Sequence, residues 1–191
     1  MVETLALIVW AYLLGSISSA IVLSKIMGFK DPRSEGSNNP GATNVLRIAG
    51  KKAAFLTLVG DFLKGLLPVL LAHWLQPELL TLALTGFAAF IGHCFPLYFG
   101  FRGGKGVATA IAAALGFNWI VGAILIAIWL LFAGVFKISS LAAIISFCAL
   151  PVLVYWRTQN LEVCIVFVAL SVILIWRHKG NIQRLIQGSE S

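Results

Sequence analysis

The stretch FPLYFGFRGGKGVAT, residues Phe95–Thr109, places glycines, an arginine and a lysine between two long apolar runs. Glycine lets the backbone come close to a ligand because no side chain intervenes. Backbone N–H groups exposed in this way donate to an anion, and Lys105 adds a positive charge. The stretch therefore predicts an anion-binding loop between membrane-type segments, and phosphate is the commonest such anion.

The whole chain has the composition of a membrane protein that crosses the bilayer several times. Of its 191 residues, 60% are hydrophobic and 11% are charged, whereas a soluble domain carries about a quarter charged residues. Nothing resembles a linker or a low-complexity tract, so we expect a single all-α domain over residues 1–191. The net charge of +7 is read as a signal of membrane topology and anionic substrates, and no nucleic-acid partner is expected.

The apolar segments predict a bundle of seven spans, because a helix that crosses a bilayer needs about 20 apolar residues. One of them, residues 107–117, is much shorter than the others. The segments are expected at residues 5–27, 53–75, 79–99, 107–117, 119–136, 138–155 and 161–176.

Charge predicts the orientation of these spans. Basic residues gather after the first, third, fifth and seventh segments, while Glu3, Glu78 and Glu162 mark the opposite ends, where Arg157 is the basic exception. Basic loops tend to stay in the cytoplasm. With seven crossings the N-terminus is expected outside and the C-terminus inside, with the basic clusters on the cytoplasmic face.

The short fourth segment predicts a recess in that face. A helix over residues 107–117 covers only about 16 Å of a hydrocarbon core that is about 30 Å thick. If this segment crosses, the loop before it must lie below the membrane surface. Irregular backbone at that depth is tolerated only inside protein or beside a wet cavity, so a polar cavity open to the cytoplasm is expected.

The first polar loop along the chain, GSNNPGATNVLR over residues 36–47, is dense in hydroxyl and amide groups. Arg47 adds a forked guanidinium that suits phosphate. Thr43 or Asn44 could instead cap the following helix, but a cap needs one such residue and the loop holds several. We expect a binding role for Ser37, Asn39, Gly41, Thr43, Asn44 and Arg47.

The glycine-lysine loop is not a nucleotide-binding P-loop. That pattern needs a glycine where this chain has Phe99 and a Ser or Thr where Gly106 follows Lys105. Because the loop precedes a helix near Val107, an anion bound there would meet the positive end of that helix. The alternative is a flexible turn whose charges only set topology. Anion binding is expected at Gly103, Gly104, Lys105, Gly106 and Thr109.

A third polar cluster, RHKGNIQRL, follows the last apolar segment at residues 177–185. His178 and Asn181 are three residues apart and so share a helix face, where they would form a donor pair or a proton acceptor. The alternative is a basic flank with a bystander histidine. Within the spans, Asp61 and Lys64 are also three apart and predict a structural ion pair. No spacing typical of a metal site occurs, so neither a metal nor a cofactor is expected.

Together these clusters resemble the bacterial acyl-phosphate:glycerol-3-phosphate acyltransferase family, known as PlsY. The family carries a Ser-Asn-Gly-Thr-Asn-Arg loop, a G-H-x-F-P…GGKGVAT loop and an R-H-x-x-N-I-x-R-L run. These are matched in order by residues 36–47, 92–109 and 177–185.

The resemblance implies an enzyme of the bacterial inner membrane with its active site facing the cytoplasm. It would transfer a fatty acyl group from acyl phosphate to the sn-1 hydroxyl of glycerol 3-phosphate, giving lysophosphatidic acid and inorganic phosphate. Acyl-carrier protein is not implied as a direct donor. The glycine-lysine loop would then hold acyl phosphate, and glycerol 3-phosphate would meet Ser37, Asn39, Asn44, Arg47, His178 and Asn181.

The residues leave two questions open. Either His178 or a substrate phosphate oxygen could take the proton of the attacking hydroxyl. A transporter for phosphorylated small molecules is the alternative function, although it would want polar groups across the bilayer and often internal repeats, neither of which is found. A scaffold without catalysis would leave the glycine-lysine loop unexplained.

Overall fold

The computed structural model describes residues 2–190, and within them the chain is helical with no strand. A 3₁₀ turn at Leu97–Phe99 interrupts the α-helices. The α-helices are α1 Val2–Gly15, α2 Ser19–Met27, α3 Ala42–Leu75, α4 Leu79–Cys94, α5 Val107–Phe117, α6 Trp119–Phe136, α7 Ser139–Thr158, α8 Leu161–Arg177 and α9 Lys179–Ile186.

Each predicted apolar segment is largely helical, and two of them have the predicted bounds. α5 and α6 begin and end at the expected residues. The first segment, expected as one helix over residues 5–27, is divided into α1 and α2 by a break at residues 16–18. The second segment differs most, because α3 begins at Ala42 and not at Ala53 and bends at Gly50, where φ is 82°. Part of the polar segment predicted as a loop is therefore the first turns of a helix. Because Thr43 and Asn44 lie inside α3 and Gly41 precedes it, neither caps the helix as the alternative reading had it.

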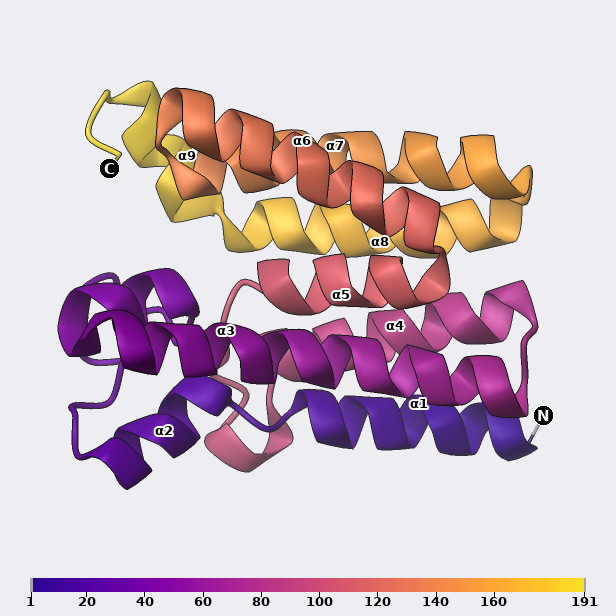
Figure 1. The fold of residues 1–191 in the computed structure, drawn as a ribbon, viewed down its shortest axis with the longest axis horizontal. Helices are drawn as coiled ribbons and strands as arrows, with labels where there is room; N and C mark the ends of the chain where they lie inside the picture. The colour runs from indigo at the N-terminus through magenta and orange to yellow at the C-terminus, as the bar shows by residue number, and fades with distance from the viewer. Residues whose placement is uncertain (1, 191) are drawn as a thin grey trace.

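The long helices run side by side in a bundle, with α1, α3 and α4 on one side and α6, α7 and α8 on the other (Figure 1). α5 lies between the two groups and packs on α3, α4 and α6. α2, α9 and the polar loops gather at one end. The two termini lie at opposite ends of the bundle, which agrees with an odd number of passes (Figure 1).

The middle of the bundle is apolar and closely packed around α5. Its alanines Ala110, Ala112, Ala113 and Ala114 are buried, with at most 1% of each exposed. Small residues let helix backbones approach, which is how helices pack where lipid removes the hydrophobic drive between them. The core therefore keeps α5 inside the bundle and fixes where its first residue, Val107, lies along the bundle.

The described residues contain five helical segments long and apolar enough to cross a membrane, or six if α8 and α9 form one bent span. α5 is apolar but shorter than that criterion requires. The protein is thus a multi-pass membrane protein. The seven crossings and their orientation stay predictions.

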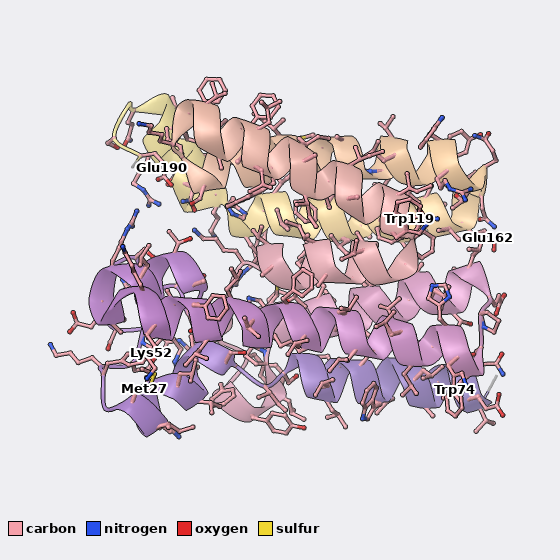
Figure 2. All side chains as sticks on the ribbon, in the orientation of Figure 1. Met27, Lys52, Trp74, Trp119, Glu162 and Glu190 are labelled. Carbon is pink, nitrogen blue, oxygen red and sulfur yellow. The ribbon has the colours of Figure 1, made fainter. Side chains whose placement is uncertain are left out.

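The charged ends of the bundle differ in the predicted way. Lys52 and Glu190 lie at the end that carries the polar loops, while Trp74, Trp119 and Glu162 lie at the other (Figure 2). Trp74 and Trp119 are exposed, as is usual for tryptophans at the boundary between lipid and water. The polar loops therefore gather at one end of the bundle, and the side of the membrane that this end faces stays a prediction.

Candidate active site

A cavity of about 1090 Å³ opens among the polar loops and continues between apolar helices. Its polar end is formed by the first loop and the start of α3, by the loop before α5, and by the segments that begin α7 and follow α8. Its apolar end is lined by side chains of α3, α5 and α6. One cavity therefore joins the three polar clusters of the sequence to an apolar groove.

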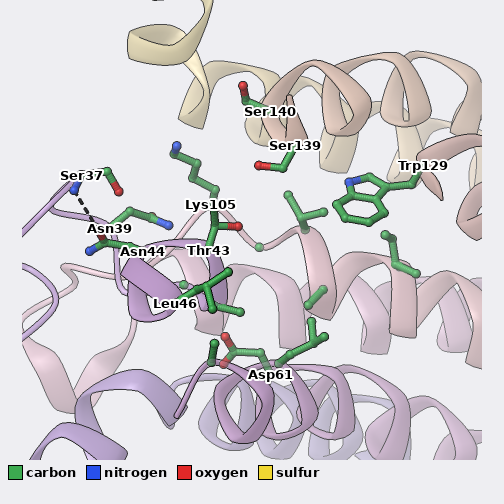
Figure 3. Close-up of a pocket in the computed structure, with 18 of the residues that line it drawn as sticks. Ser37, Asn39, Thr43, Asn44, Leu46, Asp61, Lys105, Trp129, Ser139 and Ser140 are labelled. Atoms are coloured by element: carbon green, nitrogen blue, oxygen red, sulfur yellow. Dashed lines mark hydrogen bonds between the residues drawn. The ribbon is translucent and has the colours of Figure 1, made fainter. Parts of the chain in front are cut away.

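Asn44 organises the first loop from inside α3. Its side-chain Oδ1 accepts from the backbone N–H of Ser37 at 2.9 Å (Figure 3), and its Nδ2 donates to the carbonyls of Pro32 and Glu35 at 3.0 and 2.9 Å. The side chain is 1% exposed. Both ends of the amide are thus used to shape the loop that presents Ser37, and the predicted contact of Asn44 with substrate stays a prediction.

The two glycines before Lys105 allow close contact of the loop with the backbone and the ring of His93. A side chain on Gly103 would come within 2.1 Å of the carbonyl oxygen of His93, and one on Gly104 would come within 2.2 Å of the His93 ring. The Gly104 N–H donates to the His93 carbonyl at 3.2 Å. His93 therefore supports this loop as a buttress, and the amide of Gly104 is already engaged.

Arg177 fixes the same loop from the other side. Its guanidinium donates to the carbonyls of Gly103 at 2.7 Å and Gly104 at 3.0 Å, and it lies 5.4 Å from the centre of the Phe95 ring. Arg177, which belongs to the third polar cluster, therefore holds the glycine-lysine loop in place. It does not line the cavity, and neither does Lys179.

Lys105 follows this rigid turn and reaches into the cavity. Gly106 lies at the N-cap position just before α5 with φ at 84°, where a side chain would meet the Phe90 ring at 2.3 Å. The ammonium of Lys105 donates to Oδ1 of Asn181. Burial disfavours its charged form and lowers the pKa of Lys105 to about 8. A bound anion would stabilise that charge.

His178 lies at the bend of 58° between α8 and α9 and is 2% exposed. Its Nδ1 is 2.8 Å from the carbonyl oxygen of Leu174. Because a carbonyl only accepts, Nδ1 must carry the proton, which leaves Nε2 of the neutral ring with a lone pair. The bend also separates His178 from α9, so the pair His178 and Asn181 spans a helix junction and does not share one continuous helix face.

Beneath the polar end lies a buried ion pair. Lys64 Nζ is 2.9 Å from Asp61 Oδ1, and both side chains are at most 5% exposed. Lys64 also donates to the carbonyl of Ile17 at 2.8 Å. Thr109 donates to the backbone carbonyl of Asp61 at 2.9 Å. The predicted pair is confirmed. Lys64 links α3 to the break between α1 and α2, and Thr109 links α5 to the backbone of α3.

The structure brings most of the predicted residues together. Gly103, Gly104 and Thr109 lie behind the cavity wall and support it, so their contact with substrate stays a prediction. The predicted residues that line the cavity are Ser37, Asn39, Gly41, Thr43, Asn44, Arg47, Lys105, Gly106, His178 and Asn181.

Some lining residues were not predicted. Ser139 and Ser140 come from the start of α7 and Trp129 comes from α6 (Figure 3). Glu190 comes from the segment after α9. Ser139 and Ser140 follow Lys137, which the charge pattern already assigned to the same face as the polar loops, so their position offered a signal. No pattern in the sequence marks Trp129 or Glu190.

The apolar part of the cavity suits a hydrocarbon chain. Trp129 stands where the groove meets the polar end, with the nitrogen of its indole turned toward Ser139 (Figure 3). That N–H has no partner among the described residues. Further along, the groove is lined by Phe55, Leu58, Phe62, Ile111, Ile126 and Leu130.

Among the described residues no three His, Cys, Asp or Glu side chains gather in a way that would hold a metal. The described lining offers its own groups for binding and chemistry. These are cations and amide or hydroxyl donors for anions, one histidine nitrogen with a lone pair, and a groove for an apolar chain.

The chain matches the family model for glycerol-3-phosphate acyltransferases over residues 5–188, and it belongs to that family. It is 49% identical over 185 residues to the glycerol-3-phosphate acyltransferase of Methylococcus capsulatus, covering 97% of this chain and 93% of that one. It is 50% identical to that of Thioalkalivibrio sulfidiphilus, with 97% and 91% covered.

Solved structures agree with this assignment. The fold matches the crystal structure of PlsY, an integral membrane glycerol 3-phosphate acyltransferase, in its glycerol 3-phosphate form. The TM-score is 0.93 and the identity is 37%, with 99% of this chain and 94% of that one covered. The lysophosphatidic acid form of PlsY matches with a TM-score of 0.88 at 36% identity, with the same coverage. The predicted resemblance is confirmed.

Proposed function

We propose that the protein transfers a fatty acyl group from acyl phosphate to the sn-1 hydroxyl of glycerol 3-phosphate, releasing lysophosphatidic acid and inorganic phosphate. The observation that carries this proposal is the single cavity with a cationic polar end and an apolar groove. Acyl phosphate has the same two halves. The family and the PlsY structures support glycerol 3-phosphate as the acceptor.

The polar end must hold two anions at once. Each phosphate brings up to two negative charges near pH 7, and the two substrates would repel each other without cations between them. Arg47, Lys105 and Arg184 line this end. A low-dielectric rim strengthens their attraction for phosphate. We assign acyl phosphate to Lys105 and Gly106, and glycerol 3-phosphate to Ser37, Arg47, His178 and Asn181, with Asn39, Gly41 and Thr43 completing the wall.

The reaction needs positioning more than strong acid catalysis, because the phosphate of a mixed anhydride leaves readily. The sn-1 oxygen forms a bond to the acyl carbonyl carbon as its proton passes to a base, and the bond from that carbon to the phosphate oxygen then breaks. We assign the base role to Nε2 of His178, because the Leu174 carbonyl fixes the proton on Nδ1. The competing acceptor is a phosphate oxygen of the substrate.

The acyl chain would lie in the groove between α3, α5 and α6 and enter from the side. Leu58 and Leu130 line the groove yet are also exposed on the surface that faces lipid, at 46% and 58%. A donor dissolved in the bilayer would thus reach the cavity without a protein carrier. This favours free acyl phosphate over a chain delivered by acyl-carrier protein.

We place the enzyme in the bacterial inner membrane with the cavity open to the cytoplasm. The support is the basic composition of the loops at that end, Lys25, Lys30, Arg33, Lys51 and Lys52 among them. Glycerol 3-phosphate, a charged and water-soluble substrate, would enter from that side.

The test is an assay of the purified protein in detergent with acyl phosphate and glycerol 3-phosphate. We expect equal amounts of inorganic phosphate and lysophosphatidic acid, both dependent on protein. Acyl-carrier protein thioester given in place of acyl phosphate should yield no product. Uptake of glycerol 3-phosphate into protein-containing vesicles without acyl transfer would instead indicate the transporter.

A further inference from the structure

The carboxylate of Glu190 lies in the polar end of a cavity that is otherwise built for anions. Its Oε1 accepts from the hydroxyl of Ser140 at 2.7 Å and from Nδ2 of Asn181, and its Oε2 accepts from Nε of Arg184 at 2.6 Å. These donors come from α7 and α9. The side chain of Glu190 is 7% exposed, although it belongs to the last described residue of the chain.

The path of the backbone explains how this residue reaches the cavity. Gly188 adopts a left-handed conformation with φ at 67°, and the N–H of Ser189 then donates to the carbonyl of Arg184 at 2.9 Å. This turn closes α9 and directs the chain back over its own helix. Glu190 is thereby carried from the surface onto the donors of the cavity.

The contact is more than a surface ion pair with Arg184. Arg184 is 45% exposed, and on its own it would form an ion pair of little value in water. Ser140 is 5% exposed and Asn181 is 6% exposed, so the carboxylate also satisfies two buried polar groups. Asn181 in turn accepts from Lys105. Glu190 and Lys105 thus belong to one network of hydrogen bonds, joined through Asn181.

A carboxylate held by a hydroxyl, an amide and a guanidinium uses the donors that a phosphate monoester would use. We propose that Glu190 is an internal placeholder for a substrate phosphate: it occupies one phosphate subsite of the empty enzyme and must leave before that phosphate binds. This inference rests on the proposed function. The ligand class is a phosphate monoester or acyl phosphate, and the experiment decides between the two substrates.

The placeholder has a measurable consequence. A substrate that binds only after Glu190 leaves has an apparent dissociation constant equal to the intrinsic value divided by the fraction of enzyme already open. Removing the carboxylate raises that fraction to one. The Michaelis constant of the displaced substrate should therefore fall several-fold while kcat stays the same or rises.

The experiment compares Glu190→Gln and Glu190→Ala with the parent protein, varying glycerol 3-phosphate and acyl phosphate in turn. Glu162→Gln is the matched control, since it removes a carboxylate from the opposite end of the bundle. We expect a lower KM for one of the two substrates, which identifies the subsite, and tighter inhibition by inorganic phosphate. The control should match the parent.

Calorimetric titration of each detergent-solubilised variant with glycerol 3-phosphate and with inorganic phosphate gives a readout that does not need turnover. If the parent makes no lysophosphatidic acid, the proposed function fails, yet tighter binding of either anion by the variants would still support the placeholder. Unchanged KM values and affinities in both variants would overturn it. So would a fall in kcat with weaker anion binding, which would instead make Glu190 a residue that positions the donors.

Discussion

Lys105 combines burial with a positive charge, and this combination makes the reaction depend on pH. Its pKa is lowered to about 8 by burial, so the ammonium is charged below that pH and neutral above it. Since kcat/KM reports the free enzyme, we expect it to fall about tenfold per pH unit above pH 8. Corrected for spontaneous hydrolysis of acyl phosphate, a pH profile of kcat/KM measures this.

Lys105→Arg is the matching variant. A guanidinium stays charged far beyond this range, so the alkaline decline should move up by more than one pH unit even if overall activity is lower. The same decline at pH 8 in both proteins would show that another group controls it.

The hydrogen bond of His178 decides which of its ring nitrogens can act as a base. Because its Nδ1 is held by Leu174, Nε2 is the nitrogen with a free lone pair. If Nε2 accepts the hydroxyl proton, His178→Gln should lower kcat by about 10²- to 10⁴-fold with a smaller change in KM. Initial rates at saturating substrate measure this effect. Turnover near that of the parent would assign the proton to a substrate phosphate oxygen.

The buried pair of Asp61 and Lys64 leads to a prediction about stability. Asp61→Asn removes the partner of an ammonium that is 5% exposed, which costs about 3–5 kcal/mol because the remaining charge is uncompensated. We expect a large fall in the thermal unfolding midpoint in detergent. Glu35→Gln, which breaks the exposed pair with Lys30, should change it little. Asp61→Asn combined with Lys64→Met should recover part of the loss.

At the scale of the elements, close approach at glycine sets how α3 and α5 pack. A side chain on Gly65 would lie 2.2 Å from the carbonyl oxygen of Thr109, where backbone must shift. Gly65→Ala should therefore destabilise the protein by about 1–3 kcal/mol and lower activity through the loop that precedes α5. Gly134→Ala on α6, where no atom lies within 4 Å, is the control and should be neutral or slightly stabilising. Thermal unfolding of both variants compares them.

The bounds of elements could be predicted where a local signal marks them. Asn118 accepts from the N–H groups of Ile120 and Val121 and so marks where α6 begins. The start of α3 had no such signal. Its first turns carry polar residues of the binding segment, which resemble a loop in sequence, yet they are helical and place Val45 in the core at 0% exposure.

The residues of the candidate site could be predicted where they lie in polar clusters of the sequence. The segments around Arg47, Lys105 and His178 each stand out by composition, and the structure brings them together around one cavity. Glu190 did not stand out, because a lone glutamate is ordinary in sequence, and Ser140 was marked only by its closeness to Lys137. Their place in the site follows from how α7 and the turn at Gly188 pack, and this depends on the whole fold.

At the scale of the whole molecule, the predicted orientation awaits a direct test. In a variant without the native cysteines, Gln187→Cys after α9 and Glu78→Cys between α3 and α4 are both exposed. We expect a membrane-impermeant thiol reagent to label Glu78→Cys in intact spheroplasts, and Gln187→Cys only after the inner membrane is opened. Labelling of Gln187→Cys in intact spheroplasts would place the cavity on the periplasmic face and contradict the proposed direction of substrate entry.

The shortness of α5 has a consequence for how the enzyme tolerates different membranes. Its side chains are largely buried against α3, α4 and α6, so lipid does not set its length. A helix in contact with lipid must tilt or stretch when the bilayer thickens, but this one is insulated by its neighbours. The outer helices can adjust to lipids of different chain length while the reactive loop keeps its geometry, so growth temperature and lipid composition should alter the surroundings of the catalyst more than its chemistry.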